Sequence, residues 1–213
     1  MDNIQKTIYF VRHGATPLNE ARTYQFSDTP LSEKGLKQAM LVAERFKTIS
    51  VDVVISSQMK RALQTSGMIA EASSRPLVES PLLHEMLRPS AIHGRPHADP
   101  EAVEIFTQTV ADFENTERRH SDEENFFDIK KRALELLTFL KEREEKNIVA
   151  VTHGTFLHMI MATMMEGEEV QARTFHNFQK FLYPSNTGIT RCVLRNDVWR
   201  LLVWSDDAHL GSL

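Results

Sequence analysis

Short apolar runs alternate along this chain with longer stretches of helical periodicity, and this alternation restricts the fold more than any other feature of the sequence. Residues 8–11, 51–55 and 147–152 are compact apolar runs, and each of them predicts a buried strand. Strands that alternate with helices form mostly parallel sheets whose two faces are both covered by helices. We therefore expect a three-layer α/β/α fold with a mostly parallel central sheet.

The predicted helices lie between and after these strands. Their ranges are residues 32–49, 58–72, 99–120, 125–146 and 155–165. Two further strands are predicted at residues 188–194 and 198–204, because Asn196 and Asp197 form a good turn pair between two apolar runs. A chain of 213 residues can bury a substantial core, and the sequence has no repeat or linker. We expect one domain over residues 1–213.

Charge and hydropathy exclude several classes of protein. The formal net charge is −4, which gives no basis for general binding to nucleic acids or membrane surfaces. The polar residues 1–3 lead into an apolar run that is too short for an export signal or a membrane span, so a cytoplasmic location is expected. Cys192 is the single cysteine, which rules out an intramolecular disulfide and suits a reducing compartment.

Two histidine–glycine pairs follow predicted strands. His13-Gly14 comes after the first strand with Arg12 attached, and His153-Gly154 comes after the strand at residues 147–152. In sheets of this kind ligands bind outside the carboxyl ends of strands, and glycine lets the backbone approach a ligand closely. One such pair could be structural, but two pairs in the same context favour a binding or catalytic site.

Arg61 opens the predicted helix that follows the second strand. An arginine near a helix N-terminus opposes the helix dipole, and a bound anion would compensate for it. The alternative is an ordinary surface arginine at the start of a helix.

These motifs are part of a longer ordered series. Residues 12–19 read RHGATPLN, residues 28–39 carry DTPLS with Gly35, Gln38 and Ala39, residues 56–65 read SSQMKRALQT, residues 151–154 read VTHG, and residues 185–189 read SNTGI. In this order they resemble the motifs of the histidine phosphatase superfamily, also called phosphoglycerate mutase-like, over nearly the whole chain. The resemblance implies the phosphoglycerate mutase-like α/β/α fold and phosphoryl transfer through a histidine.

The resemblance also implies catalytic roles. His13 is the implied nucleophile, because a neutral imidazole can attack phosphorus if its other ring nitrogen donates to a backbone carbonyl. Arg12 and Arg61 offer planar forks that suit phosphoryl oxygens, and His153 adds another donor. The helix after Gly154 would direct backbone N–H groups at the same anion. Such a pocket holds phosphate without a metal, so we expect no cofactor.

A proton donor is needed for the leaving oxygen. The resemblance implies Glu85, which would protonate the leaving group and then activate water against phosphohistidine. A solvated loop glutamate is the alternative for Glu85, and Glu79 is the competing carboxylate.

Four residues are candidate substrate contacts on the same resemblance: Asn19, Gln25, Phe26 and Thr155. Asn19 and Gln25 could equally cap a turn. Phe26 replaces a glycine common in the family, and residues 87–95 lack the usual family pattern, so we expect both to govern substrate choice. The remaining histidines show no zinc-ligand spacing; they are His84, His93, His97, His120, His158, His176 and His209.

The resulting functional hypothesis is a metal-independent phosphatase that acts on a small phosphomonoester. A phosphoglycerate mutase uses the same histidine chemistry, and a phosphoprotein or phosphohistidine phosphatase is compatible with the same pocket. A non-catalytic binding protein is the least supported alternative, because His13 and both arginines are intact. The sequence leaves the substrate and the oligomeric state open.

Overall fold

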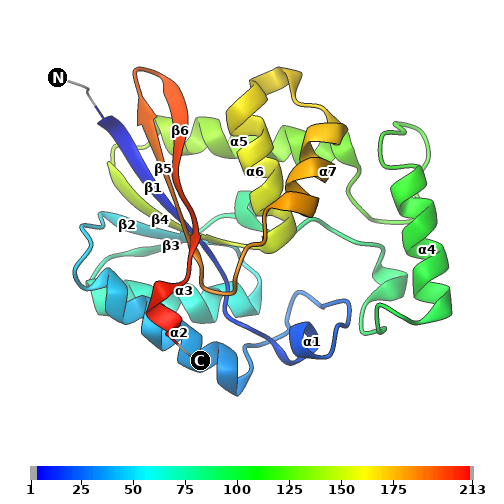
Figure 1. Cartoon of the computed structure of the whole chain (residues 1–213), viewed down its shortest axis with the longest axis horizontal. Coiled ribbons are helices and arrows are strands. Elements are labelled where there is room, and N and C mark those ends of the chain that lie inside the picture. Colours follow the sequence, from blue (N-terminus) through cyan, green and yellow to red (C-terminus); the bar gives the residue numbers. More distant parts are fainter. Residues whose placement is uncertain (1–3, 212–213) are drawn as a thin grey trace.

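The computed structural model describes residues 4–211 and contains one six-stranded sheet in the order β3-β2-β4-β1-β5-β6 (Figure 1). The strands are β1 (Ile4–Arg12), β2 (Val53–Ser56), β3 (Leu77–Glu79), β4 (Asn147–Thr152), β5 (Ile189–Arg195) and β6 (Val198–Asp206). Strands β3, β2, β4 and β1 pair in parallel, whereas β5 and β6 are antiparallel. The expected mostly parallel sheet is confirmed. The polar residues 1–3 lie outside the described residues.

Helices cover both faces of this sheet (Figure 1). The helices are α1 (Pro17–Glu20), α2 (Glu33–Phe46), α3 (Lys60–Ser73), α4 (Pro100–Ala111), α5 (Phe126–Glu142), α6 (Gly154–Glu166) and α7 (Ala172–Phe181). Alternate residues of β1 serve the two cores: Ile8 and Phe10 pack with α5 and α6, whereas Val11 packs with α2 and α3. Among residues 4–211 no helix has the length and apolarity needed to cross a membrane.

One predicted helix is wrong in its second half. The helix expected over residues 99–120 begins after its N-cap Asp99 but ends at Ala111. Beyond it the side chain of Asn115 accepts hydrogen bonds from the backbone N–H groups of Glu117 and Arg118, which closes a turn in place of a helical turn. The sequence reading also placed no helix at α1 or α7.

The predicted C-terminal hairpin is confirmed. Asn196 and Asp197 join β5 to β6, and both have a positive φ (50° and 61°). Turns of this kind match the twist of antiparallel strands, and asparagine and aspartate tolerate the left-handed conformation better than most residues do.

The loop after β1 is packed tightly against α2. The side-chain oxygen of Gln38 accepts the N–H of Ala15 at 2.9 Å, and the Ala15 carbonyl accepts the N–H of Ser32 at 2.9 Å. A Cβ atom added to Gly35 would lie 1.9 Å from the Ala15 carbonyl oxygen. The glycine and glutamine of the second sequence motif therefore serve to hold the loop that carries the first motif.

We predict that Gly35→Ala destabilises the protein by at least about 1–3 kcal/mol, because the added methyl group overlaps rigid backbone. Gly67→Ala is the matched control: it lies within α3, nothing is within 4 Å of its added Cβ, and the change should be neutral or stabilising by up to about 1 kcal/mol. Urea denaturation of both variants measures the difference. Equal stabilities would show that α2 does not pack on the loop this closely.

Candidate active site

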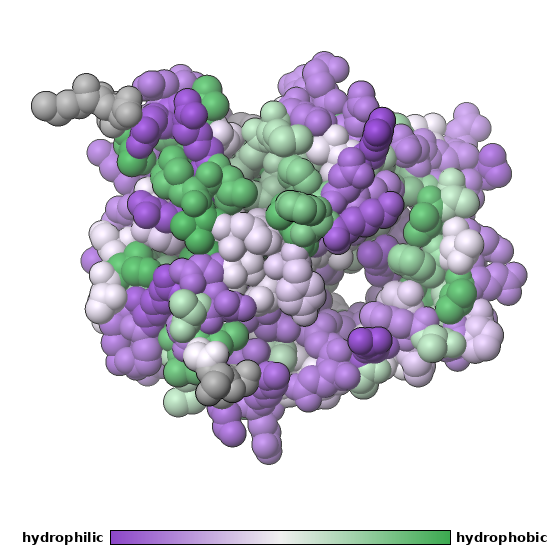
Figure 2. Space-filling model, in the orientation of Figure 1, coloured by the Kyte–Doolittle hydropathy of each residue, from purple (hydrophilic) through white to green (hydrophobic). Residues whose placement is uncertain are grey.

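A cavity of about 1040 Å³ opens at the carboxyl end of the parallel strands. The space-filling view shows the molecule hollowed beside the part formed by α4 (Figure 2). Eight of the nine residues predicted for the site line this cavity: Arg12, His13, Asn19, Gln25, Phe26, Arg61, Glu85 and Thr155. The ninth, His153, is fully buried behind the wall, and its ring centroid lies 4.9 Å from that of His13.

The register of β1 and β4 brings the two histidines together. Arg12 pairs with Thr152, and the backbone N–H of His13 continues the ladder by donating to the Thr152 carbonyl at 3.0 Å. Because the two parallel strands end side by side, the residues that follow them, His13 and His153, must be neighbours.

His13 is held in one tautomer and in its neutral form. Its Nδ1 lies 2.7 Å from the Gly14 carbonyl oxygen and must carry the hydrogen, since a carbonyl only accepts. Its Nε2 accepts from the Nε–H of Arg61 at 3.3 Å. Burial first, and then the charges of Arg61 and Arg12, lower the pKa of His13 well below 6.5. The lone pair on Nε2 therefore faces the guanidinium of Arg61 at the cavity wall.

The backbone around His13 is fixed by side chains from distant segments. The Gly14 N–H donates to the Thr65 hydroxyl at 3.1 Å, and the Thr65 hydroxyl donates to the Arg61 carbonyl at 2.8 Å. The Asn186 side-chain amide donates to the His13 carbonyl at 2.8 Å. Residues of the third and fifth sequence motifs therefore position the nucleophile candidate, although Thr65 and Asn186 do not line the cavity.

The two predicted arginines approach His13 from different elements. Arg12 ends β1 and donates to the Pro184 carbonyl at 2.6 Å, while its buried Nε has no partner. Arg61 lies in the first turn of α3 and donates to the Phe26 carbonyl at 2.9 Å. Burial lowers the pKa of Arg61 to about 10, which leaves it charged at neutral pH. Two guanidinium groups in one cavity make a strong anion site.

His153 has one satisfied and one free ring nitrogen. Its Nε2 lies 2.8 Å from the Ser57 hydroxyl, whereas its buried Nδ1 has no partner. Burial, followed by the charge of Arg61, lowers the pKa of His153 well below 6.5. A neutral ring that accepts from Ser57 at Nε2 has its hydrogen on Nδ1, where it is available as a donor.

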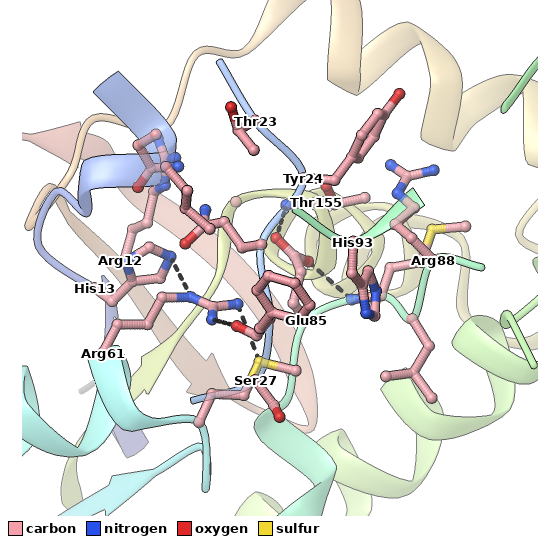
Figure 3. A pocket seen from close by; sticks show the side chains of 18 of the residues that line it. Arg12, His13, Thr23, Tyr24, Ser27, Arg61, Glu85, Arg88, His93 and Thr155 are labelled. Carbon is pink, nitrogen blue, oxygen red and sulfur yellow. Dashed lines mark hydrogen bonds between the residues drawn. The ribbon is translucent and has the colours of Figure 1, made fainter. Parts of the chain in front are cut away.

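Glu85 and the exposed Asp28 are the carboxylates that line the cavity, and Glu85 is the one held at the start of a helix. Its two oxygens accept from the backbone N–H groups of Thr155 at 3.1 Å, Phe156 at 2.8 Å and Met86 at 2.9 Å, so the carboxylate lies at the N-terminus of α6. Figure 3 shows it between the His13 side and the opposite wall. The competing Glu79 is exposed at the end of β3 and does not line the cavity.

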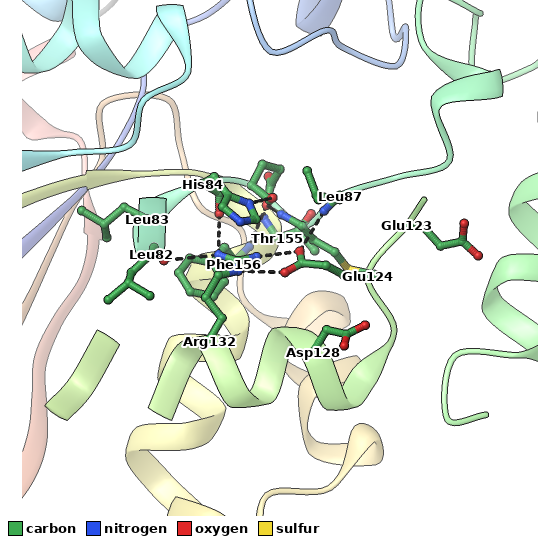
Figure 4. Close-up of polar contacts among 12 residues, drawn as sticks. Leu82, Leu83, His84, Leu87, Glu123, Glu124, Asp128, Arg132, Thr155 and Phe156 are labelled. Atoms are coloured by element: carbon green, nitrogen blue, oxygen red, sulfur yellow. Dashed lines mark hydrogen bonds and ion pairs between the residues drawn. The ribbon is translucent and has the colours of Figure 1, made fainter. Parts of the chain in front are cut away.

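A buried ion pair holds the segment that carries Glu85 (Figure 4). Arg132 of α5 forms a two-pronged pair with Glu124 at 2.8 and 2.7 Å, and it also donates to the carbonyls of Leu82 and His84. Glu124 in turn accepts the N–H of Leu87 at 2.9 Å. The pair therefore fixes the backbone on both sides of Glu85.

Sequence reasoning missed this pair, although a signal was present. Arg132 occupies the same helix face as the buried Ile129, Ala133 and Leu136, and its guanidinium lies 3.9 Å from the centre of the Phe156 ring. A charged residue in an apolar stripe predicts a buried partner.

The far wall of the cavity was also missed in part. It is formed by Arg22, Tyr24, Arg88, His97 and Phe106. His158, whose role the sequence left open, borders the cavity and donates from Nε2 to the Leu182 carbonyl at 2.7 Å. Within residues 4–211 no group of three or more His, Cys, Asp or Glu side chains is arranged to hold a metal ion.

The lowered pKa of His13 predicts a pH dependence of stability. Below pH 6.5 the unfolded chain binds a proton at this residue that the folded protein does not. The free energy of unfolding therefore decreases as the pH is lowered. The slope from one such group is at most about 1.4 kcal/mol per pH unit. We predict that His13→Asn loses stability less steeply than the wild type between pH 7 and pH 5, as measured by urea denaturation.

The matched control is His120→Asn, because His120 is exposed in a loop. This variant should follow the wild-type curve. Parallel curves for His13→Asn and the wild type would show that folding does not lower the pKa of His13.

Comparison with known proteins gives one consistent result. The sequence pattern of the histidine phosphatase superfamily (branch 1) matches residues 8–207. A Yersinia pestis protein named probable phosphoglycerate mutase GpmB is 30% identical over 212 residues, covering 95% of this chain and 94% of that protein.

Two solved structures share the fold. Bacillus stearothermophilus YhfR has a TM-score of 0.81 at 24% identity, covering 97% of this chain and 100% of that one. The phosphoserine phosphatase of Entamoeba histolytica, solved with phosphoserine, has a TM-score of 0.78 at 25% identity, covering 96% and 99%.

Proposed function

This chain belongs to branch 1 of the histidine phosphatase superfamily, and on that basis we propose that it is a phosphatase that hydrolyses small phosphomonoesters through a phosphohistidine at His13. The observation that carries the proposal is the state of His13, whose Nδ1–H is bound to the Gly14 carbonyl and whose Nε2 keeps its lone pair. This lone pair accepts a hydrogen bond from the Nε–H of Arg61, so Arg61 must turn from His13 to the phosphate before the neutral imidazole attacks phosphorus.

In the first step, Nε2 of His13 forms a bond to phosphorus as the bond from phosphorus to the leaving oxygen breaks. The charge on the phosphoryl oxygens is stabilised by Arg12 and Arg61, with His153 donating from Nδ1. Once Arg61 has turned from His13 to the phosphate, these groups supply charges and donors at fixed positions, so catalysis is chiefly positioning and charge stabilisation. Support comes from the unpartnered Nε of Arg12 and Nδ1 of His153, both buried beside His13.

Glu85 is the proposed general acid and base. It gives a proton to the leaving alkoxide, and the same carboxylate then takes a proton from the water that attacks phosphohistidine. Its position supports this role, because it lines the cavity that contains His13. Backbone N–H groups bind both of its oxygens and fix its orientation. The Arg132–Glu124 pair acts as a positioning device for its segment.

The proposed reaction uses no cofactor and no metal, since the two arginines supply the positive charge. The substrate contacts proposed from the sequence are Asn19, Gln25, Phe26 and Thr155. All four line the cavity, and Gln25 accepts from the Thr16 hydroxyl at 2.9 Å while Asn19 has a buried side-chain oxygen without a partner.

Phosphoglycerate mutase is the second candidate, because the Yersinia pestis relative carries that name. A mutase returns the phosphoryl group to an organic hydroxyl, whereas a phosphatase gives it to water. Hydrolysis is favoured here by exposed residues such as Arg22, Phe26 and Leu87 around a wide cavity, through which water can enter. Release of inorganic phosphate, compared with movement of phosphate between the positions of phosphoglycerate, separates the two.

The role of Glu85 predicts a dependence on the leaving group. An alkyl phosphate releases a basic alkoxide that needs a proton, whereas p-nitrophenolate leaves without help. Glu85→Gln should therefore slow the release of alcohol from alkyl esters by about 10²–10⁴-fold and the release of p-nitrophenol far less. Single-turnover release of the alcohol measures the first step alone.

Glu79→Gln is the matched control and should behave as the wild type, because Glu79 lies outside the cavity. Equal losses on both ester types would assign Glu85 a positional role only. A fully active Glu85→Gln enzyme would remove it from the mechanism.

A further inference from the structure

The segment after β6 contacts the turn that precedes β5. A short helix, η4 (Ala208–Leu210), lies beside α2 at the red end of the chain (Figure 1). From it, Nε2 of His209 lies 3.1 Å from the hydroxyl of Thr187. That hydroxyl donates its single hydrogen to the Asn186 carbonyl at 2.7 Å, so it accepts from the Nε2–H of His209. The proposed reaction makes no direct use of this contact.

Thr187 has a backbone conformation that is unfavourable for its side chain. It is fully buried and has a φ of 61°, which lies in the left-handed region. Residues that branch at Cβ are outliers in this region, and such strain persists only where the surroundings hold it. The Thr187 hydroxyl is bound on one side by Asn186 and on the other by His209. The bond from His209 therefore helps to keep this residue in its strained conformation.

The strained turn binds the backbone of two residues of the site. The Thr187 N–H donates to the Arg12 carbonyl at 2.8 Å, and the Asn186 side-chain amide donates to the His13 carbonyl at 2.8 Å. A change of the backbone angles at Thr187 would move both donors. The nucleophile candidate and the arginine beside it would then lose the contacts that fix their carbonyl groups.

We propose that His209 is a positioning residue for Arg12 and His13 and acts on them through Thr187. This inference rests on the proposed function for the chemistry of Arg12 and His13. Burial, followed by the charge of Arg45, lowers the pKa of His209, so the ring is neutral at pH 7 and its one N–H is on Nε2. Among residues 4–211 the buried Nδ1 of this ring has no hydrogen-bond partner, which leaves Nε2 as the atom that binds.

Attachment of the C-terminal segment does not depend on His209, because other contacts hold it. Asp206 forms an ion pair with Arg45 of α2, and its other carboxylate oxygen accepts the N–H of Ala208 at 3.0 Å. A histidine that only attached this segment would affect stability when replaced. A positioning residue also affects the rate of the chemical step.

The test removes the N–H donor and measures the first chemical step. His209→Leu should lower the maximal single-turnover rate of p-nitrophenol release from p-nitrophenyl phosphate by about 3- to 10-fold, the factor expected for one hydrogen bond. The half-saturating ester concentration should change by less than about 2-fold, because the arginine side chains still bind the phosphate. His209→Gln keeps an N–H donor near the position of Nε2 and should restore most of the rate.

Thr187 allows the same test from the other side of the bond. Thr187→Val removes the hydroxyl but keeps the branched shape, and it should slow the reaction at least as much as His209→Leu does. It decides the question if His209→Leu fails to fold. The double variant should be no slower than Thr187→Val, because both changes remove one bond. Additive losses, or a His209→Gln enzyme as slow as His209→Leu, would overturn the proposal.

Leu210→Ala is the control within the same short helix. Leu210 is half-buried beside His209 and has no hydrogen-bonding side chain, so this change should lower the thermal stability without slowing the reaction. Thermal unfolding of every variant measures the loss of stability separately. A wild-type rate in a folded His209→Leu enzyme would overturn the proposal.

If the wild type releases no p-nitrophenol, the proposed function fails, and amide hydrogen exchange then decides the positioning role separately. The Thr187 amide donates to the Arg12 carbonyl, so its exchange should accelerate by about 3- to 10-fold in His209→Leu relative to the amide of Val149 in the core of β4. An unchanged ratio of the two exchange rates would show that His209 does not hold Thr187 in place.

Discussion

The in-register ending of β1 and β4 is the constraint on which the site depends. These two parallel strands stop at the same level, with Arg12 opposite Thr152, so that the residues after them are forced together. His13 and His153 become neighbours although they are far apart in the sequence, and the helix that starts at Gly154 directs its N-terminus at the same space. The other proposed catalytic groups are arranged around this junction.

Buried polar side chains then hold the backbone of the loops that the strands alone do not fix. Thr65, Gln38 and Asn186 bind the backbone of the loop after β1, and the Arg132–Glu124 pair holds the backbone around Glu85. A buried ion pair is costly to desolvate and contributes little net stability. Its value here is geometric, because it keeps a carboxylate in place across from a histidine that burial keeps neutral.

The sequence predicts what is encoded locally. Strand ends marked by His-Gly, the loop motifs and the Asn196–Asp197 turn are contiguous in the chain, and the structure places them as expected. The partners of Arg132 and the wall around Arg88 were not predictable in the same way. They depend on loops from distant parts of the chain that meet only after folding, and no short-range periodicity encodes which loops pair.

The measurement that tests the central claim most directly is the identification of a phosphorylated residue during turnover. Glu85→Gln and wild-type protein are mixed with p-nitrophenyl phosphate in the presence of EDTA, quenched in base and mapped by mass spectrometry. The account predicts a base-stable, acid-labile phosphoryl group on His13, most abundant in Glu85→Gln because the water step is slowed, and none in His13→Ala. Turnover without phosphate on His13, or phosphorylation that requires a divalent metal, would contradict it.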